Sequence, residues 1–247
     1  MTRPRVAAVI PVRMGSTRFP GKALAAETGL ALVLHVADAA AAAKHVDEVL
    51  VASDHPDIEV VVTQAGVRHV MTRQDHPNGS SRVAEVAAKI DADIVVNVQG
   101  DEPELDPGLI DQCIEGLIAD EEASVGTLAT PIINDGDDQS AHVVKVVLDE
   151  AGRALYFSRC PIPASRDGES VPRLRHIGIY AYRRASLMAY PDLSPSALEQ
   201  AEQLEQLRLL AHRMPITVAL CEAGPEGIDT PTQYAAFVDR WRREHPD

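Results

Sequence analysis

The residues that decide the fold are Ile10 to Lys22, which read IPVRMGSTRFPGK. The apolar run over 6–9 precedes them and predicts the first buried strand of a sheet. Glycines and cationic side chains then follow within a few positions, without the spacing of a Walker loop. Small residues let backbone N–H groups approach phosphate oxygens, and cations neutralise charge in phosphoryl or nucleotidyl transfer. The stretch therefore predicts a triphosphate-binding βα loop, with an ordinary polar turn as the open alternative.

After the first strand, segments with strand-like and helix-like patterns alternate along the chain. This alternation predicts a parallel sheet with right-handed crossovers. The expected strands are 46–52, 67–71 and 93–98, and the expected helices are 31–44, 58–65 and 83–89. From Val125 the pattern changes to strand-like pieces separated by loops, and Ser196 to His212 predicts one helix. We expect an α/β fold in a single domain over 1–247, with a mixed β insertion at about 125–190.

The composition describes an acidic chain of 247 residues with a formal net charge of −14 at pH 7. This balance argues against nucleic acid as a partner, whereas a local cationic cluster can still bind an anionic substrate. The three cysteines are isolated and lack metal-ligand spacing, which favours a reducing cytoplasmic compartment. The apolar runs are too short for a signal peptide or a membrane span, so no membrane partner is expected.

Two aspartates are candidate ligands for Mg²⁺. Asp101 follows the apolar strand 93–98, and ligands of open parallel sheets bind beyond the carboxyl ends of the strands. Arg13, Arg82 and Asp101 are therefore expected to converge, although they are far apart in sequence. Asp229 lies in the turn 227–231, and the alternative is that it only caps the last helix. Nucleotidyl transfer needs a hard cation held by one or two carboxylates and by phosphate oxygens.

Other polar stretches allow both functional and structural interpretations. The segment Asn78–Arg82 can lie over a base or a phosphate, or can simply start a helix. Arg159 and His176 offer donors for a carboxylate or phosphonate, although a lone histidine is by default structural. Glu199 and Gln200 recur at helical spacing and can bind hydroxyl groups or form a solvated helix face.

Six stretches together resemble the CMP-Kdo synthetase family, the 3-deoxy-manno-octulosonate (Kdo) cytidylyltransferases. They cover nearly the whole chain in the same order: IPVRMGSTRFPGKALA, DIVVNVQGDEPELDP, VVKVVLDEAGRALYFSRCPIP, RHIGIYAYRR, SALEQAEQLEQLR and PEGIDTP. The resemblance implies a Rossmann-like nucleotidyltransferase fold whose β insertion builds a homodimer. It also implies an enzyme that uses CTP and Mg²⁺, transfers CMP to a small acidic acceptor and releases pyrophosphate.

The same resemblance assigns roles to individual side chains. The implied catalytic residues are Arg13, Lys22 and Asp101, and the implied magnesium ligands are Asp101 and Asp229. The implied nucleotide-binding residues are Ser16, Arg18, Ser80, Arg82 and Gln99. The implied acceptor-binding residues are Arg159, His176, Glu199 and Gln200.

The chain departs from the family pattern near the acceptor more than near the metal. The family usually has Ser-Gly-Thr-Asp-Arg where this chain has Asn78 to Arg82, so an acidic residue is lost. Kdo is the expected acceptor. The alternative is a phosphonate such as phosphonoformate, which a similar branch of the family cytidylates during antibiotic biosynthesis. A third hypothesis is a non-catalytic nucleotide-binding protein, because fold alone does not establish activity.

Overall fold

The computed structural model describes residues 3–16, 18–133, 135–166 and 172–246. The strands are β1 (Val6–Pro11), β2 (Glu48–Ser53), β3 (Arg68–Met71), β4 (Ile94–Asn97), β5 (Val125–Pro131), β6 (Lys145–Leu148), β7 (Ala154–Ser158), β8 (Leu174–Arg183) and β9 (Ile216–Leu220). The α-helices are α1 (Leu32–Ala41), α2 (Pro56–Gln64), α3 (Gly79–Ala87), α4 (Pro107–Ala119), α5 (Asp135–Gln139), α6 (Arg184–Ala189), α7 (Ala197–Glu202), α8 (Gln206–Ala211) and α9 (Pro231–Glu244). Two short 3₁₀ helices span Lys22–Leu24 and Tyr190–Asp192.

The strands form one mixed sheet in the order β3-β2-β1-β4-β8-β5-β9, with β6 and β7 beside β8. The first four strands pair in parallel, as the alternating sequence pattern predicts. Strand β8 runs antiparallel to both β4 and β5, and the β6–β7 hairpin is also antiparallel. The predicted α/β fold, a mostly parallel sheet with a β insertion, is confirmed.

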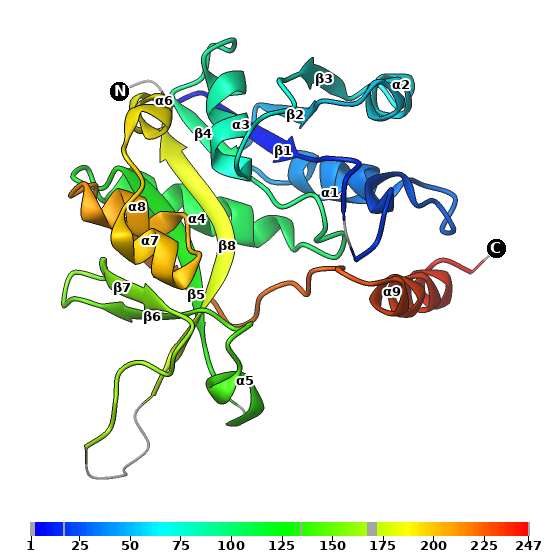
Figure 1. Cartoon of the computed structure of the whole chain (residues 1–247). Coiled ribbons are helices and arrows are strands. Elements are labelled where there is room, and N and C mark those ends of the chain that lie inside the picture. The colour runs from blue at the N-terminus through cyan, green and yellow to red at the C-terminus, as the bar shows by residue number, and fades with distance from the viewer. Residues whose placement is uncertain (1–2, 17, 134, 167–171, 247) are drawn as a thin grey trace.

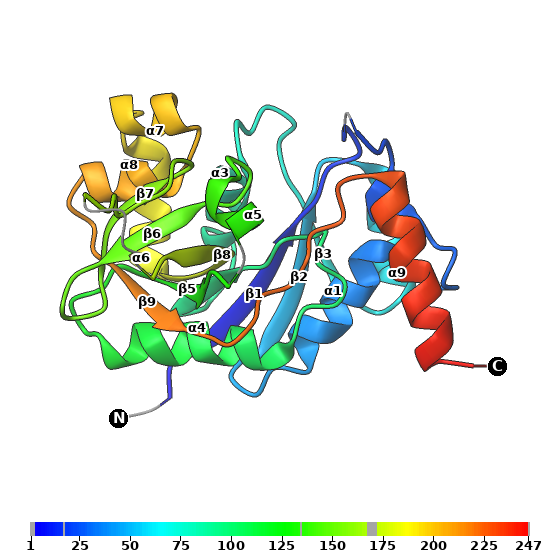
Figure 2. The same cartoon turned by 90° about the horizontal axis from the view of Figure 1, so that it is seen from below.

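Both faces of the sheet are buried, which explains the continuous apolar run in β1. Ala8 and Ile10 contribute to the core under α1 and α4, whereas Ala7 and Val9 contribute to the core under α3. Figure 2 shows α1 and α4 on one face of the sheet and α3 on the other. A strand buried on both faces loses the alternation of polar and apolar residues that marks a half-exposed strand.

The predicted single helix over 196–212 is wrong, because the chain forms two short helices there. Gln203 ends α7 in the left-handed region, with φ of 53°. The guanidinium of Arg159 donates to the carbonyl of Glu202 at 2.7 Å and to that of Gln203 at 3.3 Å. Both carbonyls lie at the end of α7 and would accept backbone N–H groups if the helix continued. The side chain of Arg159, which directly follows β7, donates to them instead.

The last helix returns to the N-terminal part of the chain. Figure 1 shows α9 beside the loop that follows β1 and far from the β6–β7 hairpin. Tyr234 and Phe237 of α9 pack with Leu32, and the Phe19 and Tyr234 rings lie 5.5 Å apart. This packing fixes the turn that contains Asp229. Among the residues that the structure describes, no helix has both the length and the apolar character needed to cross a bilayer.

Candidate active site

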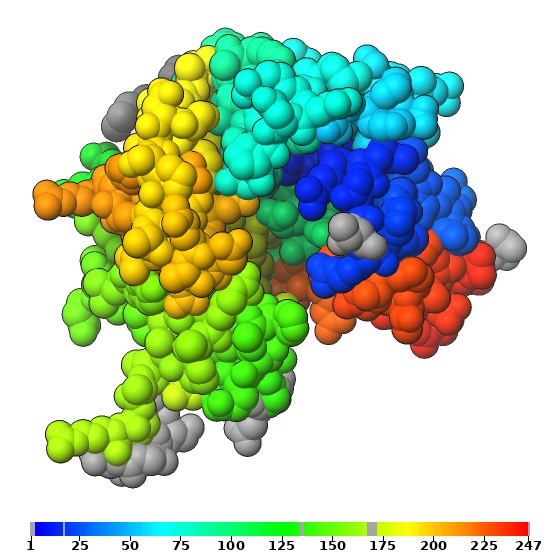
Figure 3. All heavy atoms as spheres, viewed as in Figure 1, coloured from blue at the N-terminus to red at the C-terminus, as the bar shows by residue number. Residues whose placement is uncertain are grey.

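A cleft of about 400 Å³ opens at the carboxyl ends of β1 and β4, the two strands where the strand order changes direction. Figure 3 shows this hollow between the blue N-terminal residues on one side and the yellow residues, at about 185–200, on the other. Parts of three stretches line it, namely 11–23, 76–82 and 99–101, together with Glu205 and Asp229. Ligands of open α/β sheets bind at such switch points. The convergence expected for Arg13, Arg82 and Asp101 is therefore observed.

Gly21 turns the first loop so that its polar side chains line the cleft. Its φ of 73° lies in the left-handed region, which glycine adopts without steric cost. The carbonyl of Met14 accepts the N–H groups of Ser16 at 2.9 Å and of Gly21 at 3.2 Å. The loop closed in this way lines the cleft with Ser16, Arg18 and Lys22.

Lys22 lies between the two aspartates that the sequence offers as metal ligands. Its Nζ is 2.6 Å from Asp101 Oδ2 and 3.5 Å from Asp229 Oδ1. It also donates to the carbonyl of Ile228 at 2.8 Å. Arg18 Nη2 lies 2.9 Å from the same oxygen of Asp229. Two cations and two carboxylates from three distant parts of the chain thus form one charge cluster.

The chemistry of this cluster fits a magnesium ion. Magnesium prefers oxygen ligands and is held by one or two carboxylates with substrate phosphates and water. Asp101 and Asp229 supply such a pair, and one ammonium group already contacts both carboxylates. The cations beside them are suited to the phosphate oxygens that a metal–nucleotide complex brings.

Gly100 allows the loop after β4 to lie against the end of β1. A Cβ at this position would be 2.4 Å from Cγ1 of Val12 and 3.2 Å from the carbonyl oxygen of Pro11. The neighbouring Asp101 carbonyl accepts the N–H of Ile228 at 2.8 Å. The absence of a side chain at position 100 therefore lets the first loop, the β4 loop and the Asp229 turn meet.

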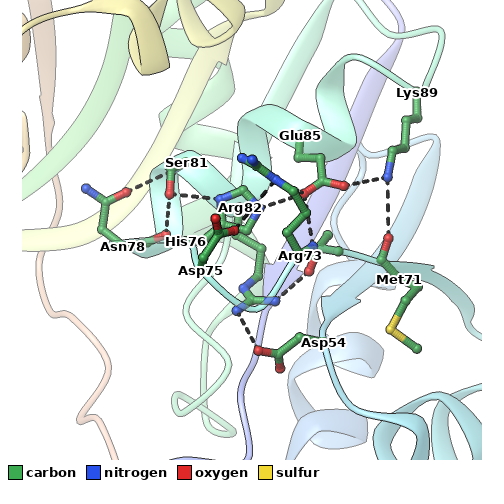
Figure 4. Close-up of polar contacts among 11 residues, drawn as sticks. Asp54, Met71, Arg73, Asp75, His76, Asn78, Ser81, Arg82, Glu85 and Lys89 are labelled. Atoms are coloured by element: carbon green, nitrogen blue, oxygen red, sulfur yellow. Dashed lines mark hydrogen bonds and ion pairs between the residues drawn. The ribbon is translucent and has the colours of Figure 1, made fainter.

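Three further predicted nucleotide-binding residues, Ser80 and Arg82 of α3 and Gln99 after β4, have different surroundings. Arg82 lines the cleft, and its guanidinium lies 3.2 Å from Asp54 Oδ2 and donates to the hydroxyl of Thr72 (Figure 4). Ser80 is buried outside the cleft lining, with its hydroxyl 3.4 Å from that of Tyr182. Gln99 lines the cleft and donates to the carbonyl of Gly178 at 3.1 Å.

A second cavity of about 230 Å³ neighbours the cleft. Glu102 and Gly178 line this cavity, whereas Gln99 and Asp101 line the cleft. The consecutive residues Asp101 and Glu102 therefore line different cavities. Burial, together with the nearby Asp101 carboxylate, raises the pKa of Glu102 to about 8, against the opposing effect of Arg175. A protonated carboxyl at neutral pH can donate a hydrogen bond to an anionic ligand.

His176 is the one predicted acceptor residue that lines the second cavity. Burial lowers the pKa of its imidazole to about 3, so the ring is neutral at pH 7. Nε2 lies 3.0 Å from the hydroxyl of Thr127.

The other predicted acceptor residues line neither cavity. Arg159 is engaged with the carbonyls at the end of α7. Glu199 accepts from Arg208 at 2.6 and 2.7 Å and completes the capping box of α7. Gln200 is exposed on the same helix. Their assigned roles remain predictions.

The sequence interpretation missed Glu205 and His76, which both line the cleft. Burial raises the pKa of the Glu205 carboxyl, and hydrogen bonds from Ser80 oppose this effect. A continuous helix over 196–212 conceals Glu205, because the break at Gln203 has no glycine or proline to mark it. His76 lies in a polar loop and gains its partners only when that loop folds onto α3.

Comparison with known proteins places this chain in a family. The profile of the Cytidylyltransferase family matches residues 7–216. The chain is 44% identical to 3-deoxy-manno-octulosonate cytidylyltransferase of Geobacter metallireducens, with 97% of this chain and 98% of that protein covered. The chain belongs to the 3-deoxy-manno-octulosonate cytidylyltransferase family. The family resemblance inferred from the sequence motifs is thus confirmed.

Further relatives agree with this assignment. The protein of the same name from Herminiimonas arsenicoxydans is 47% identical, over 90% of this chain and 93% of that protein. A solved structure of CMP:2-keto-3-deoxy-manno-octonic acid synthetase complexed with CTP superposes with a TM-score of 0.93. It is 40% identical, and the match covers 97% of this chain and 99% of that chain.

Proposed function

We propose that this cytidylyltransferase transfers CMP from CTP to Kdo and releases pyrophosphate. The observation that carries the proposal is the cleft at the strand switch point, where Arg18 and Lys22 lie against Asp101 and Asp229. The relatives described above carry Kdo in their names, and the similar solved structure was determined with CTP. The proposal extends these properties to the present chain.

The proposed reaction is an in-line displacement at the α-phosphorus of CTP. A hydroxyl oxygen of the acceptor forms a bond to this phosphorus and loses its proton to water, while the bond between the α-phosphorus and the bridging oxygen breaks and pyrophosphate leaves. Lys22, Arg13 and Arg18 neutralise charge on the phosphates, and fixed charges of this kind supply much of the catalysis. Asp101 and Asp229 hold magnesium, which supplies further charge neutralisation when bound.

The two cavities provide separate places for the two substrates. We place the triphosphate in the larger cleft and the acceptor in the second cavity, beside His176. Gln99 lies between them, because it lines the cleft and donates to Gly178 of the second cavity. Such an arrangement brings the reacting atoms together in one orientation, which itself accelerates a two-substrate reaction.

We also propose that the insertion at 125–190 serves dimerisation. Leu155 of β7 is 62% exposed. Within the described residues β7 pairs only with β6, which leaves its outer edge available. The three free cysteines fit a reducing compartment, and we place the enzyme in the cytoplasm.

Pyrophosphate release measured with CTP and Mg²⁺ tests the proposed reaction. Kdo and phosphonoformate are offered side by side, and we expect consumption of Kdo alone. Consumption of phosphonoformate without Kdo would replace the acceptor but retain cytidylyl transfer. Tight CTP binding with no pyrophosphate from either acceptor would favour a non-catalytic nucleotide-binding protein.

A further inference from the structure

The start of α3 is joined to a buried tyrosine by an asparagine that also lines the cleft. Asn78 directly precedes α3, and its Oδ1 accepts the N–H of Ser81 at 2.9 Å (Figure 4). Its Nδ2 donates to the hydroxyl of Tyr190 at 3.0 Å. Tyr190 is only 1% exposed and lies in the 3₁₀ helix after α6, 112 positions later in the chain. Both polar atoms of the Asn78 amide are therefore bonded within the protein.

The two partners of Asn78 determine the orientation of its amide. A backbone N–H can only donate, so the amide oxygen and not the nitrogen must face Ser81. The amide nitrogen therefore faces Tyr190, and the hydroxyl oxygen of Tyr190 accepts from it. Burial raises the pKa of the Tyr190 hydroxyl, so this side chain is neutral at pH 7.

Tyr190 also contacts the helix pair α7 and α8. The guanidinium of Arg208 in α8 lies over the Tyr190 ring, 4.7 Å from its centroid, which is a favourable contact between a cation and an aromatic face. The same guanidinium donates to both oxygens of Glu199 in α7, at 2.6 and 2.7 Å. Only 11% of the Arg208 side chain and 12% of the Glu199 side chain are exposed, so salt screens this ion pair little. A chain of contacts therefore runs from Asn78 through Tyr190 to both helices.

Both ends of this chain of contacts reach the lining of the cleft. Asn78 and Arg82 line the cleft from α3 and its first cap, whereas Glu205 lines it from the break between α7 and α8. Hydrogen bonds from Ser80 to Glu205 are a second link between the same two parts. The position of α3 relative to the helix pair therefore determines how far apart these side chains lie in the cleft.

Position 78 is one at which the chain departs from its family, which usually has serine there. Serine can cap a helix through its hydroxyl oxygen, so capping alone does not require asparagine. Asparagine has an acceptor and a donor on separate atoms, and here it caps α3 and holds Tyr190 at the same time. The departure at Asn78 is thus matched by a specific contact in this chain.

We propose that Asn78 is a positioning residue for CTP, which fixes the start of α3, and with it Arg82, against the helix pair through Tyr190. Without this contact the start of α3 is free to move, and nucleotide binding has to order it. The affinity for CTP then falls, whereas the chemical step depends on Lys22 and Asp101 and keeps its rate. The inference rests on the proposed function in one respect, namely that the cleft binds CTP.

A double-mutant cycle on CTP binding tests this contact. Tyr190→Phe removes the hydroxyl but keeps the ring under Arg208, and Asn78→Ser keeps a capping hydroxyl but removes the amide donor. Calorimetric titration of the full chain with CTP and Mg²⁺ gives the dissociation constant of each protein. We expect each single variant to bind CTP about three- to tenfold more weakly, as for the loss of one hydrogen bond. The double variant should bind no more weakly than the weaker single variant, because both substitutions remove the same contact.

Tyr156→Phe is the matched control for the loss of a tyrosine hydroxyl. The hydroxyl of Tyr156 bonds to Glu202, and Tyr156 lines neither cavity, so this variant should keep the wild-type affinity for CTP. Steady-state kinetics give a second readout, in which Tyr190→Phe and Asn78→Ser raise the KM for CTP but leave kcat at saturating CTP nearly constant. A simple loss of folded protein would instead lower the apparent kcat and leave KM unchanged.

Two results overturn the proposal while the proposed function stands. One is wild-type affinity for CTP in both single variants, and the other is a double variant in which the two effects multiply. A wild-type protein that binds no CTP overturns the proposed function itself and this inference with it. The cycle measures binding without turnover, so it remains decisive even when no acceptor supports pyrophosphate release.

Discussion

Asp101 connects the loop after β1 to the turn before α9, because its side chain contacts Lys22 and its carbonyl accepts the N–H of Ile228. In Asp101→Asn the shape is kept and the charge that faces Lys22 is lost. We expect kcat to fall by ~10²–10³, as when one group is removed from a preorganised charged site. The thermal midpoint should change little, because partly exposed ion pairs contribute at most about 1 kcal/mol. Pyrophosphate release and circular dichroism melting measure the two effects.

Glu104→Gln is the control for this substitution. Glu104 is three positions further along and forms an ion pair with Arg240 outside the cleft. Its activity should stay within about twofold of the wild type, as for most surface changes. Wild-type turnover in Asp101→Asn would contradict the metal assignment.

Glu85 of α3 makes the stability of the fold depend on pH. Its carboxylate accepts hydrogen bonds from Lys89, His76 and the backbone N–H of Arg73, which lower its pKa against the opposing effect of burial. Its pKa is lowered from 4.5 to about 2 in the folded chain, so its contribution is complete above pH 4.5 and is lost as pH falls toward 2. Glu85→Gln should lower the free energy of unfolding by ~1–3 kcal/mol at pH 7. Urea titrations at pH 7 and pH 3 check this, and the difference between variant and wild type should shrink at pH 3. An equal difference at both values would show that the charge is not responsible.

Among the secondary-structure elements, α4 packs against β5 at Gly126, where the strand has no side chain. A Cβ on Gly126 would be 2.8 Å from the carbonyl oxygen of Cys113 and 3.0 Å from Leu117 Cβ, both in α4. Gly126→Ala should therefore destabilise the fold by ~1–3 kcal/mol through overpacking.

Gly116→Ala provides the matched control on the helix side of the same layer. Its added methyl group would be 3.4 Å from Ala219 Cβ, an ordinary contact. Because alanine favours a helix interior over glycine, this variant should gain about 0.5–1 kcal/mol. Chemical denaturation measures both changes, and a similar effect of the two substitutions would contradict the close-packing argument.

Helices and strands that are determined by their own residues could be predicted from the sequence. A helix boundary that depends on a residue far away in the chain could not. The run over Val6–Ile10 is apolar because both faces of β1 are buried, so its own composition identifies the strand. The division between α7 and α8 depends on Arg159, which lies more than forty positions before the carbonyls that it contacts. Nothing in residues 196–212 alone carries that information.

For the whole molecule, the exposed edge of the β6–β7 hairpin leads to a prediction about assembly. We expect light scattering at micromolar concentration to give twice the chain mass of 26.6 kDa. Leu155→Lys should shift the protein toward the monomer, because it places a charge in the proposed interface. Val60→Lys is the control, since Val60 is 50% exposed on α2 at the opposite end of the sheet. A wild-type monomer, or an unchanged dimer in Leu155→Lys, would contradict this interface.

In the candidate site, too, some residues could be placed from the sequence and others depend on contacts with distant parts of the chain. The loops after β1 and β4 could be predicted to meet, because parallel strands bring their carboxyl ends to one edge of the sheet. Glu205 joins the cleft through packing between helices and β strands far apart in sequence, and the ring of His76 depends on a loop folding back onto α3. Only the three-dimensional arrangement reveals these two side chains.

The contacts of Ile228 with Lys22 and Asp101 also imply that the charge cluster is completed late in translation, because Ile228 lies near the end of the chain. Strands β1 to β4 can pair while the ribosome is still producing later residues, since segments made first generally fold first. The charge cluster needs Asp229 and the packing of α9 on Phe19 and Leu32. A nascent chain can therefore pair strands β1 to β4 before the charge cluster is complete. Chains cut before Asp229 should accumulate as inert protein and should not consume CTP.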